Sequence, residues 1–577
     1  MQKIIRRRES TATAIAEDSS LHPLLAQVYA ARGISSKDDL NLALDQLLPP
    51  DGLLNAAAAA RLLADALSTQ QRIMVVGDFD ADGATSTALV VTALREFGAL
   101  HVDFLVPNRF EYGYGLTPEI VALAAQSKPD LIITVDNGIS SLDGVAAARE
   151  IGIATLITDH HLAGRELPDA DVIVNPNQPG CTFSSKNLAG VGVIFYIMLA
   201  LRAELRSRDW FSAHPEVNLG HYLDLVALGT VADVVPLDRN NRILVAAGLA
   251  RIRAGKARPG ILALLQAGSR KYQSAVASDL GFAVGPRINA AGRLDDMSIG
   301  IACLLSNEAG EAGAIAARLQ QLNQDRRVIE QGMQEEALQI LANLPVEDES
   351  EPPVAMTLYQ SGWHQGVIGI LASRIKDRLH RPVIAFADGD PGEIKGSARS
   401  IPGVHIRDIL DAVATRHPGL ISKFGGHAMA AGMTLPLAAY DDFTAAFTEE
   451  VALHAQDLEL QAVIESDGEL SDTELQLDLA TQLRYAGPWG QHFPEPIFDG
   501  RFNIVSQRLV GEKHLKLVLS VPGSRQIIDA IAFNVDLDIW PEQSVARVDI
   551  AYRLDVNEFR GQRSLQLMVE HLVPVFE

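Results

Sequence analysis

The chain has 577 residues and a formal net charge of −23, and 47% of its residues are hydrophobic. This length predicts three or four domains, and the acidic balance argues against a general nucleic-acid binder with a broad basic face. No apolar run approaches the about 20 residues of a membrane helix, and the basic N-terminus lacks the apolar segment of a secretory signal. The two cysteines, Cys181 and Cys303, suit a reducing compartment. We therefore expect a cytoplasmic protein with no membrane partner.

The first 70 residues are expected to form an N-terminal helical segment. From Gln71 to about Pro176, short β-rich runs such as "RIMVV", "DLIITV" and "IATLIT" end in polar loops and alternate with helical stretches. This alternation indicates βαβ units and a parallel sheet, within a lobe that we expect to span residues 71–305. Such sheets bind ligands beyond the carboxyl ends of their strands.

A long amphipathic stretch follows, with Ile315, Leu319 and Leu322 on one face. Together with "PVEDESEPP" it predicts a connecting helix and linker over residues 306–350. The βα pattern resumes in a smaller α/β lobe over residues 351–455. Short alternating runs over residues 460–577 then predict an antiparallel β-barrel or sandwich.

Polar side chains gather where the strands of the first lobe end. "GDFDADG" places Asp78, Asp80 and Asp82 within five residues, and Asp136 and the triplet Asp159-His160-His161 follow later strands. Each alone could be a helix cap, a turn residue or a buried histidine. As a set they need a counter-charge. Carboxylates with imidazole suit Mg²⁺ or Mn²⁺, and so many ligands suit two ions rather than one.

An ordered series of motifs carries a family resemblance over essentially the whole chain. The series is "VVGDFDADGATSTAL", "PNRFEYGYGL", "TVDNGISS", "TDHHL", "LVALGTVADVVPL", "GPRINAAGRLDDM", "WHQGVIGILASRIK" and "KFGGHAMAAGM". It resembles the DHH phosphoesterase superfamily and, within it, the RecJ family of bacterial single-stranded-DNA exonucleases. The resemblance implies a parallel-sheet DHH lobe, a smaller α/β DHHA1 lobe joined to it by a long helix, and an oligonucleotide-binding (OB)-like β-barrel.

The resemblance also implies roles for residues of the site. The implied metal ligands are Asp78, Asp80, Asp82, Asp136, His160 and Asp233, with Asp136 bridging two Mn²⁺ or Mg²⁺ ions. Asp159 is expected to orient His160, and His161 to face the scissile phosphate or support the attacking water. Asp136, Asp159 and His161 are thus the expected catalytic residues.

Substrate contacts are expected mainly from the motifs of both lobes. The implied residues are Arg109, Arg287, Asn289, Lys395, Ser397, Arg399, Gly425, Gly426 and His427. In the barrel, the candidates for single-strand contact are Lys513, Lys516, Arg553, Phe559, Arg560 and Arg563. Residues 460–577 hold ten Lys and Arg against eighteen Asp and Glu, so a protein-docking role for this domain stays open.

The implied function is a single-stranded-DNA exonuclease that works from the 5′ end, releases mononucleotides and acts in recombination and mismatch repair. The implied partners are single-strand-binding protein and a RecQ-type helicase, and a monomer is expected. One alternative is a phosphodiesterase for short oligonucleotides, cyclic dinucleotides or pyrophosphate, against which the extra β domain argues. The other is a catalytically silent single-strand-binding protein, against which the complete ligand set argues.

Overall fold

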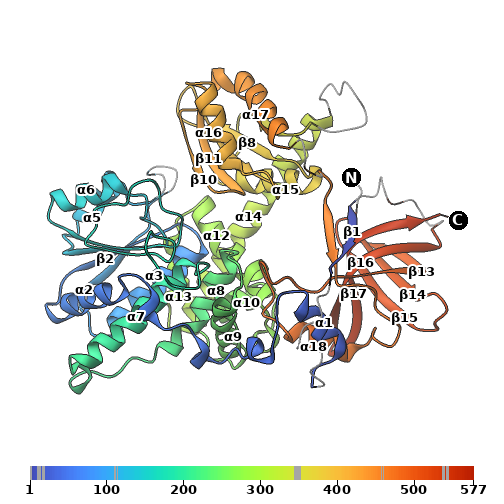
Figure 1. Ribbon diagram of the computed structural model, residues 1–577, viewed down its shortest axis with the longest axis horizontal. Helices are drawn as coiled ribbons and strands as arrows, with labels where there is room; N and C mark the ends of the chain where they lie inside the picture. Colours follow the sequence, from blue (N-terminus) through green and yellow to red (C-terminus); the bar gives the residue numbers. More distant parts are fainter. Residues whose placement is uncertain are drawn as a thin grey trace. The chain divides into compact units, whose positions relative to one another are not determined.

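The chain divides into two compact units in the computed structural model (Figure 1). The structure describes residues 3–9, 15, 20–108, 112, 115–342, 353–455, 458, 460–511, 513–535, 540 and 545–576. Unit 1 comprises Met1–Arg6 and Asn323–Ile464, and unit 2 comprises Arg7–Leu322 and Glu465–Glu577. The boundary falls inside the long helix α14 (Ala309–Ala342). None of the helices in the described part of the chain has the length and apolarity to span a bilayer.

Unit 2 is built on a five-stranded sheet of order β3-β2-β4-β5-β6, in which every neighbouring pair is parallel. Its strands are β2 (Ile73–Gly77), β3 (Val102–Leu105), β4 (Leu131–Val135), β5 (Ala154–Thr158) and β6 (Val172–Val174). Gly77 pairs with Val135, and Val135 with Thr158. The residues that follow these three strands therefore lie side by side at one edge of the sheet.

Helices cover both faces of this sheet, because the strand residues that point to one face and those that point to the other are both apolar. Val76 and Ile132 face a small core with α5 (Pro118–Ala125) and α6 (Leu142–Glu150). Val75 and Ile133 face the main core, which contains α2 (Ala56–Ser68), α3 (Ala81–Glu96) and α7 (Gly190–Ser207). The small side chains of α3 allow close packing against α7 and α8.

A helical region completes this part of unit 2. Its elements are α8 (Leu223–Ala232), α9 (Arg239–Arg253), α10 (Pro259–Ala267), α11 (Ala277–Asp279), the π-helical turn η8 (Leu280–Val284), α12 (Gly285–Leu294) and α13 (Ser298–Leu305). Helices α8, α12 and α13 pack against α3, so this region flanks the first acidic loop.

The C-terminal part of unit 2 is a closed barrel of order β13-β14-β15-β17-β16. Its strands are β13 (Phe498–Val510), β14 (His514–Ser520), β15 (Ile527–Ala532), β16 (Arg547–Phe559) and β17 (Gln562–Val575). With α1 (Pro23–Ala30) and α18 (Leu477–Tyr485), the barrel shares one apolar core with the parallel-sheet lobe. Arg32 adds an almost fully buried ion pair to Asp467 at 2.7 Å.

The sequence predicts a helical segment over the first 70 residues, but this segment also contains a strand. It begins with β1 (Ile4–Arg7), which pairs with β12 (Val463–Ser466) in a two-stranded sheet. The partner strand lies more than 450 residues away in the chain, so the local pattern of "IIRR" does not reveal the pairing.

Unit 1 is a smaller α/β layer with a mixed sheet of order β10-β11-β9-β8-β7. Its strands are β7 (Met356–Tyr359), β8 (Val383–Asp388), β9 (Glu393–Arg399), β10 (Lys423–Gly426) and β11 (Ala430–Pro436), and only β7 and β8 pair in parallel. Helices α16 (Ile406–Arg416) and α17 (Tyr440–His454) close the apolar core on one face. Helix α15 (Ile368–Leu379) packs against β8 and β9.

Candidate metal centre

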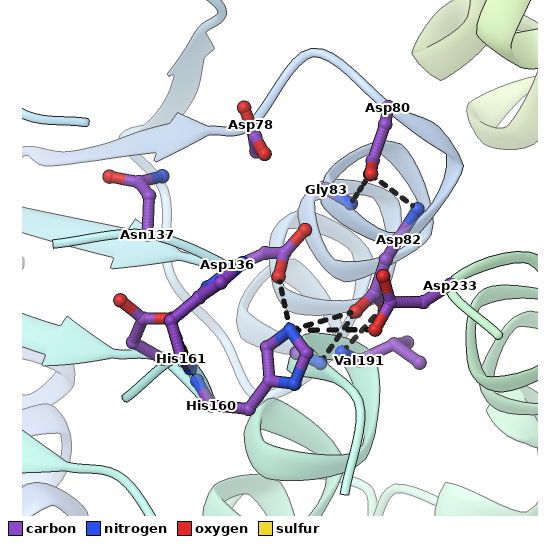
Figure 2. Close-up of polar contacts among 12 residues, drawn as sticks. Asp78, Asp80, Asp82, Gly83, Asp136, Asn137, His160, His161, Val191 and Asp233 are labelled. Atoms are coloured by element: carbon purple, nitrogen blue, oxygen red, sulfur yellow. Dashed lines mark hydrogen bonds and ion pairs between the residues drawn. The ribbon is translucent and has the colours of Figure 1, made fainter. Parts of the chain in front are cut away.

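Acidic and histidine side chains converge at the carboxyl edge of the parallel sheet (Figure 2). Asp78 follows β2, Asp136 follows β4, and Asp159-His160-His161 follow β5. Asp233 reaches the same place from the end of α8. The strand register brings the first three loops together, as the sequence predicted.

Two helix amino termini hold the first acidic loop. Asp80 is the N-cap of α3, and its Oδ1 accepts from the N–H groups of Asp82 at 2.9 Å and Gly83 at 3.0 Å. The carboxylate of Asp82 accepts from Gly190 N at 2.6 Å and Val191 N at 2.9 Å, in the first turn of α7. The positive ends of both helices therefore stabilise carboxylate charge at this point.

Glycine is required where the backbone approaches these carboxylates. A Cβ on Gly190 would lie 2.7 Å from Asp136 Cβ, and a Cβ on Gly229 would lie 2.8 Å from Asp82 Oδ1. Asp136 itself has φ 63°, a left-handed conformation that costs energy for a residue with a side chain. Asn137 holds this turn by donating to the carbonyls of Val135 and Val76. The backbone is thus shaped around the position of the Asp136 side chain.

His160 lies at the centre of the cluster. Its Nε2 is 3.1 Å from Asp136 Oδ1, 3.5 Å from Asp233 Oδ2 and 4.0 Å from Asp82 Oδ2. Three overlapping sets have ligand atoms within 4.8 Å of one another: Asp136/His160/His161, Asp82/His160/Asp233 and Asp78/Asp80/Asp136. Asp136 and His160 each belong to two sets, which is the arrangement that neighbouring ions sharing ligands require.

The electrostatics of the cluster call for positive charge. Burial, with the charge of Asp80, raises the pKa of Asp82 to about 7. Burial and the neighbouring carboxylates also raise the pKa values of Asp136 and Asp233 well above the usual range. Because so many carboxylates repel one another in a buried place, a divalent cation would relieve their repulsion. Oxygen donors with one or two imidazoles fit Mn²⁺ or Mg²⁺.

Asp159 does not take the partner that the sequence analysis gave it. Its Oδ1 is 2.7 Å from Nδ1 of the His161 ring and accepts a hydrogen bond from the backbone N–H of His160 at 2.7 Å. Its Oδ2 accepts from Ile139 N at 2.9 Å. Although burial opposes it, the bond to Asp159 raises the pKa of His161 to about 9. Asp159 therefore positions His161, and the orientation of His160 comes from its carboxylate neighbours.

Two residues predicted to bind substrate make contacts inside unit 2. Arg287 is 6% exposed, and its guanidinium donates to the backbone carbonyls of Ala283 and Ala267. Asn289 Oδ1 accepts from Ala81 N at 2.7 Å. These contacts tie Asn289 to the acidic loop, and they tie Arg287 to the backbone of η8 and α10. Arg109, a third predicted contact, lies outside the described residues.

In unit 1, the predicted substrate residues of β9 share one face of the sheet. Lys395, Ser397 and Arg399 alternate with buried residues along the strand. Arg399 Nη1 donates to Ser397 Oγ at 3.1 Å. A Cβ on Gly369, in the first turn of α15, would lie 2.8 Å from both side chains. Gly369 was not predicted as a site residue, although the glycines of "WHQGVIGILASRIK" are a signal of close approach.

The glycines of β10 and β11 leave backbone open beside this face. Gly425 pairs with Gly432, and a Cβ on either would meet nothing within 4 Å. Gly426 has φ 150°, and a Cβ there would strike the Ala430 carbonyl at 2.4 Å. His427 N donates to the same carbonyl at 2.8 Å and so closes the turn. Backbone and small side chains are therefore accessible next to Lys395, Ser397 and Arg399.

Several barrel residues predicted to contact DNA already have protein partners. Arg553 forms ion pairs with Glu495 and Glu570, both at 2.6 Å, and Lys516 pairs with Asp529 at 2.8 Å. Arg563 donates to Thr481. Phe559, by contrast, is 65% exposed, with the Arg560 guanidinium 5.2 Å from its ring centroid. Among these candidates, the tip of the β16–β17 hairpin best fits a single-strand contact.

Comparisons with known proteins agree with this architecture. Family models match at residues 72–230 (DHH family, N-terminal domain), 351–453 (DHHA1 domain) and 466–571 (RecJ OB domain). The single-stranded-DNA-specific exonuclease RecJ of Dickeya dadantii (strain 3937) is 55% identical over 573 residues, 99% of each chain.

Two solved structures of the RecJ protein from Thermus thermophilus are similar over 100% of this chain. The complex with Mn²⁺ matches with a TM-score of 0.81 and 30% identity, and 80% of that chain is covered. The complex with Mg²⁺ matches with a TM-score of 0.76 and 28% identity, and 79% of that chain is covered. The matches confirm the predicted fold class of a DHH lobe, a DHHA1 lobe and an OB-like barrel.

Proposed function

Because this chain belongs to the RecJ family of single-stranded-DNA-specific exonucleases, we propose that it hydrolyses single-stranded DNA from the 5′ end and releases mononucleotides. The observation that carries the proposal is the three overlapping ligand sets, two of which share Asp136 and two of which share His160, in a chain 55% identical to a RecJ exonuclease over 99% of its length. The metal-complex structures of a relative support Mn²⁺ or Mg²⁺ as the cofactor.

The acidic cluster divides between two ions in this proposal. Asp78, Asp80 and Asp136 hold one, and Asp82, His160 and Asp233 hold the other, with Asp136 between them. When bound, such a pair activates a water for attack on phosphorus and neutralises charge that develops on the phosphoryl group. The first turn of α7 keeps the Asp82 carboxylate in place for this task, through its bonds from Gly190 and Val191.

His161 is the proposed donor to the scissile phosphate. Asp159 holds its Nδ1 at 2.7 Å and supports a positive charge on the ring at neutral pH. A charged imidazole donates a hydrogen bond to a phosphate oxygen more strongly than a neutral one. Asp159 thus acts through His161.

The half-buried face of β9 that carries Lys395, Ser397 and Arg399 is the proposed grip on the substrate backbone. Lys395, Ser397 and Arg399 supply donors, and the open backbone at Gly425 lets a phosphate approach closely. Gly426 is a proposed contact by motif position. Arg109, Arg287, Asn289 and His427 are proposed substrate contacts by motif position, and Asn289 also holds the acidic loop through Ala81.

The proposal has a cellular side that follows from the family. We place the protein as a monomer in the cytoplasm, in recombination and mismatch repair. Single-strand-binding protein and a RecQ-type helicase are the proposed partners, because both act on or produce single strands. The proposed domain limits are residues 71–305 for the DHH lobe, 351–455 for the DHHA1 lobe and 460–577 for the OB-like barrel.

A cleavage assay tests the function. The protein is incubated with Mn²⁺ and 5′-labelled single-stranded or duplex DNA, alongside a dinucleotide and pyrophosphate. Mononucleotides from the single strand alone are expected. Asp136→Asn should lower turnover by more than about 100-fold through loss of a shared ligand. Asp143→Asn, which neutralises an exposed carboxylate on α6, is the matched control. Cleavage of only the short substrates, or equal loss in both variants, would contradict the proposal.

A further inference from the structure

Phe282 presents its ring to solvent from a rigid element beside the acidic cluster. The side chain is 79% exposed and lies in the π-helical turn η8. Its neighbours Leu280 and Val284 are both fully buried in the core. The turn is therefore anchored on both sides of the exposed ring. Single π-helical turns are rare and are frequent at functional sites.

Close glycine contacts hold η8 against the helix that leads to Asp233. A Cβ on Gly281 would lie 3.2 Å from Val231 Cγ1, and a Cβ on Gly285 would lie 3.1 Å from Ala232 Cβ. Ala232 is the last residue of α8, and Asp233 follows it directly. The backbone beneath Phe282 therefore packs on the turn that delivers a proposed metal ligand.

The helix that continues from η8 is tied to the first acidic loop. Asn289 of α12 accepts a hydrogen bond from Ala81 N at 2.7 Å. Gly292 of the same helix packs so closely on Phe79 that a Cβ would strike the Phe79 carbonyl. Through α8 and α12, the element that carries Phe282 is fixed to two of the loops that form the cluster.

A single exposed apolar residue is usually an ordinary surface feature. Phe282 differs because a second apolar side chain is exposed just after α8, the helix against which η8 packs. Val234 is 61% exposed and has φ 62°, a conformation that is strained for a β-branched residue. An aromatic ring on η8 and a valine directly after Asp233 are thus exposed on two elements that pack together, where a polar residue would cost less.

We propose that Phe282 is a nucleobase-binding platform on which a base of the substrate strand stacks while its phosphate is held at the cluster; this rests on the proposed function. Stacking on aromatic rings is the common way to bind single strands without sequence preference. In a duplex the base faces are covered by their neighbours, so a platform of this kind also favours unpaired DNA.

Binding and cleavage of a normal and an abasic oligonucleotide test the platform. The abasic strand carries tetrahydrofuran residues in place of the terminal nucleosides and keeps every phosphate. For the normal strand, Phe282→Ala should weaken binding, or raise KM, by roughly 5- to 100-fold. For the abasic strand, the same substitution should change neither quantity, because no base is present to stack. Phe282→Trp should restore the binding and cleavage of the normal strand to the wild-type level.

The controls separate stacking from folding and from the function itself. Leu100→Ala removes an exposed apolar side chain just before β3, at the amino ends of the parallel strands and so away from the cluster. It should leave the binding and cleavage of both oligonucleotides unchanged. Equal losses on normal and abasic strands, or no loss on the normal strand, would overturn the platform. Binding is measured by fluorescence anisotropy in Ca²⁺, so this comparison decides the platform even if the wild-type protein releases no nucleotides. That last result would count against the proposed function alone.

Discussion

Replacing Asp82 with Asn should stabilise the metal-free protein at pH 8 while abolishing its nuclease activity. Asp82 is 1% exposed, and burial with the charge of Asp80 raises its pKa to about 7. A carboxyl group whose pKa is raised by folding contributes stability at low pH and loses it as the pH rises through the folded-state value. Above pH 7, the charged carboxylate therefore destabilises the protein unless a cation neutralises it.

The magnitude follows from the two pKa values. The difference between the ordinary 3.8 and about 7 corresponds to about 4 kcal/mol at pH 8. Asn removes the charge, but its amide group cannot accept from both Gly190 N and Val191 N, and one lost acceptor costs about 1–3 kcal/mol. A net gain of about 1–3 kcal/mol remains at pH 8. At pH 5.5, which is still above the ordinary 3.8, about 2 kcal/mol of the penalty remains, and the lost acceptor offsets it, so the net gain should fall to about zero.

Calorimetric unfolding in EDTA at the two pH values measures this effect. We expect the transition of Asp82→Asn to lie a few degrees above that of the wild type at pH 8 and not at pH 5.5. With Mn²⁺ added, the order should reverse, since only the wild type keeps the ligand. A variant that is less stable than the wild type in EDTA at both pH values would refute the claim that repulsion dominates the empty cluster.

Three further perturbations probe other parts of the structure. Gly190→Ala should lower kcat with little change in DNA affinity, because the added methyl group strikes Asp136; an unchanged kcat in steady-state assays would contradict this. Asp159→Asn should bring the pKa of His161 down from about 9 toward its ordinary 6.5, which NMR titration of the ring would detect, and a pKa still near 9 would be the contrary result. Arg32→Met removes the closer ion-pair partner of the buried Asp467 carboxylate, leaving it only Arg8 at 4.0 Å, and should cost about 3–5 kcal/mol. Calorimetry and faster proteolysis before the barrel would report that loss, and wild-type resistance would count against it.

The sequence was most informative where function and local pattern coincide. Short apolar runs that end in Asp78, Asp136 and Asp159 predict parallel strands, and parallel strands place their ends at one edge. The sequence pattern alone therefore predicts that these side chains gather in one cluster. The ordered motifs predicted the three-part fold for the same reason, since each motif marks one loop of a known arrangement.

Contacts between segments far apart in the chain could not be predicted from local sequence patterns. The N–H groups of Gly190 and Val191 bind Asp82 across 108 and 109 residues of chain, and nothing near Gly190 in the sequence indicates this. The choice of His161 over His160 as the partner of Asp159 depends on side-chain rotation, which spacing does not reveal. Arg287 was predicted as a substrate contact, which stays a prediction, and its bonds to the Ala283 and Ala267 carbonyls come from tertiary packing that the sequence does not reveal.

The most direct test of the two-ion centre is the position of manganese in a crystal of the protein grown with Mn²⁺. Anomalous scattering should reveal two ions about 3.5–4 Å apart, both in contact with Asp136. One should lie beside Asp78 and Asp80, and the other beside Asp82, His160 and Asp233. A single ion that does not touch Asp136, or manganese bound only elsewhere on the chain, would contradict the account.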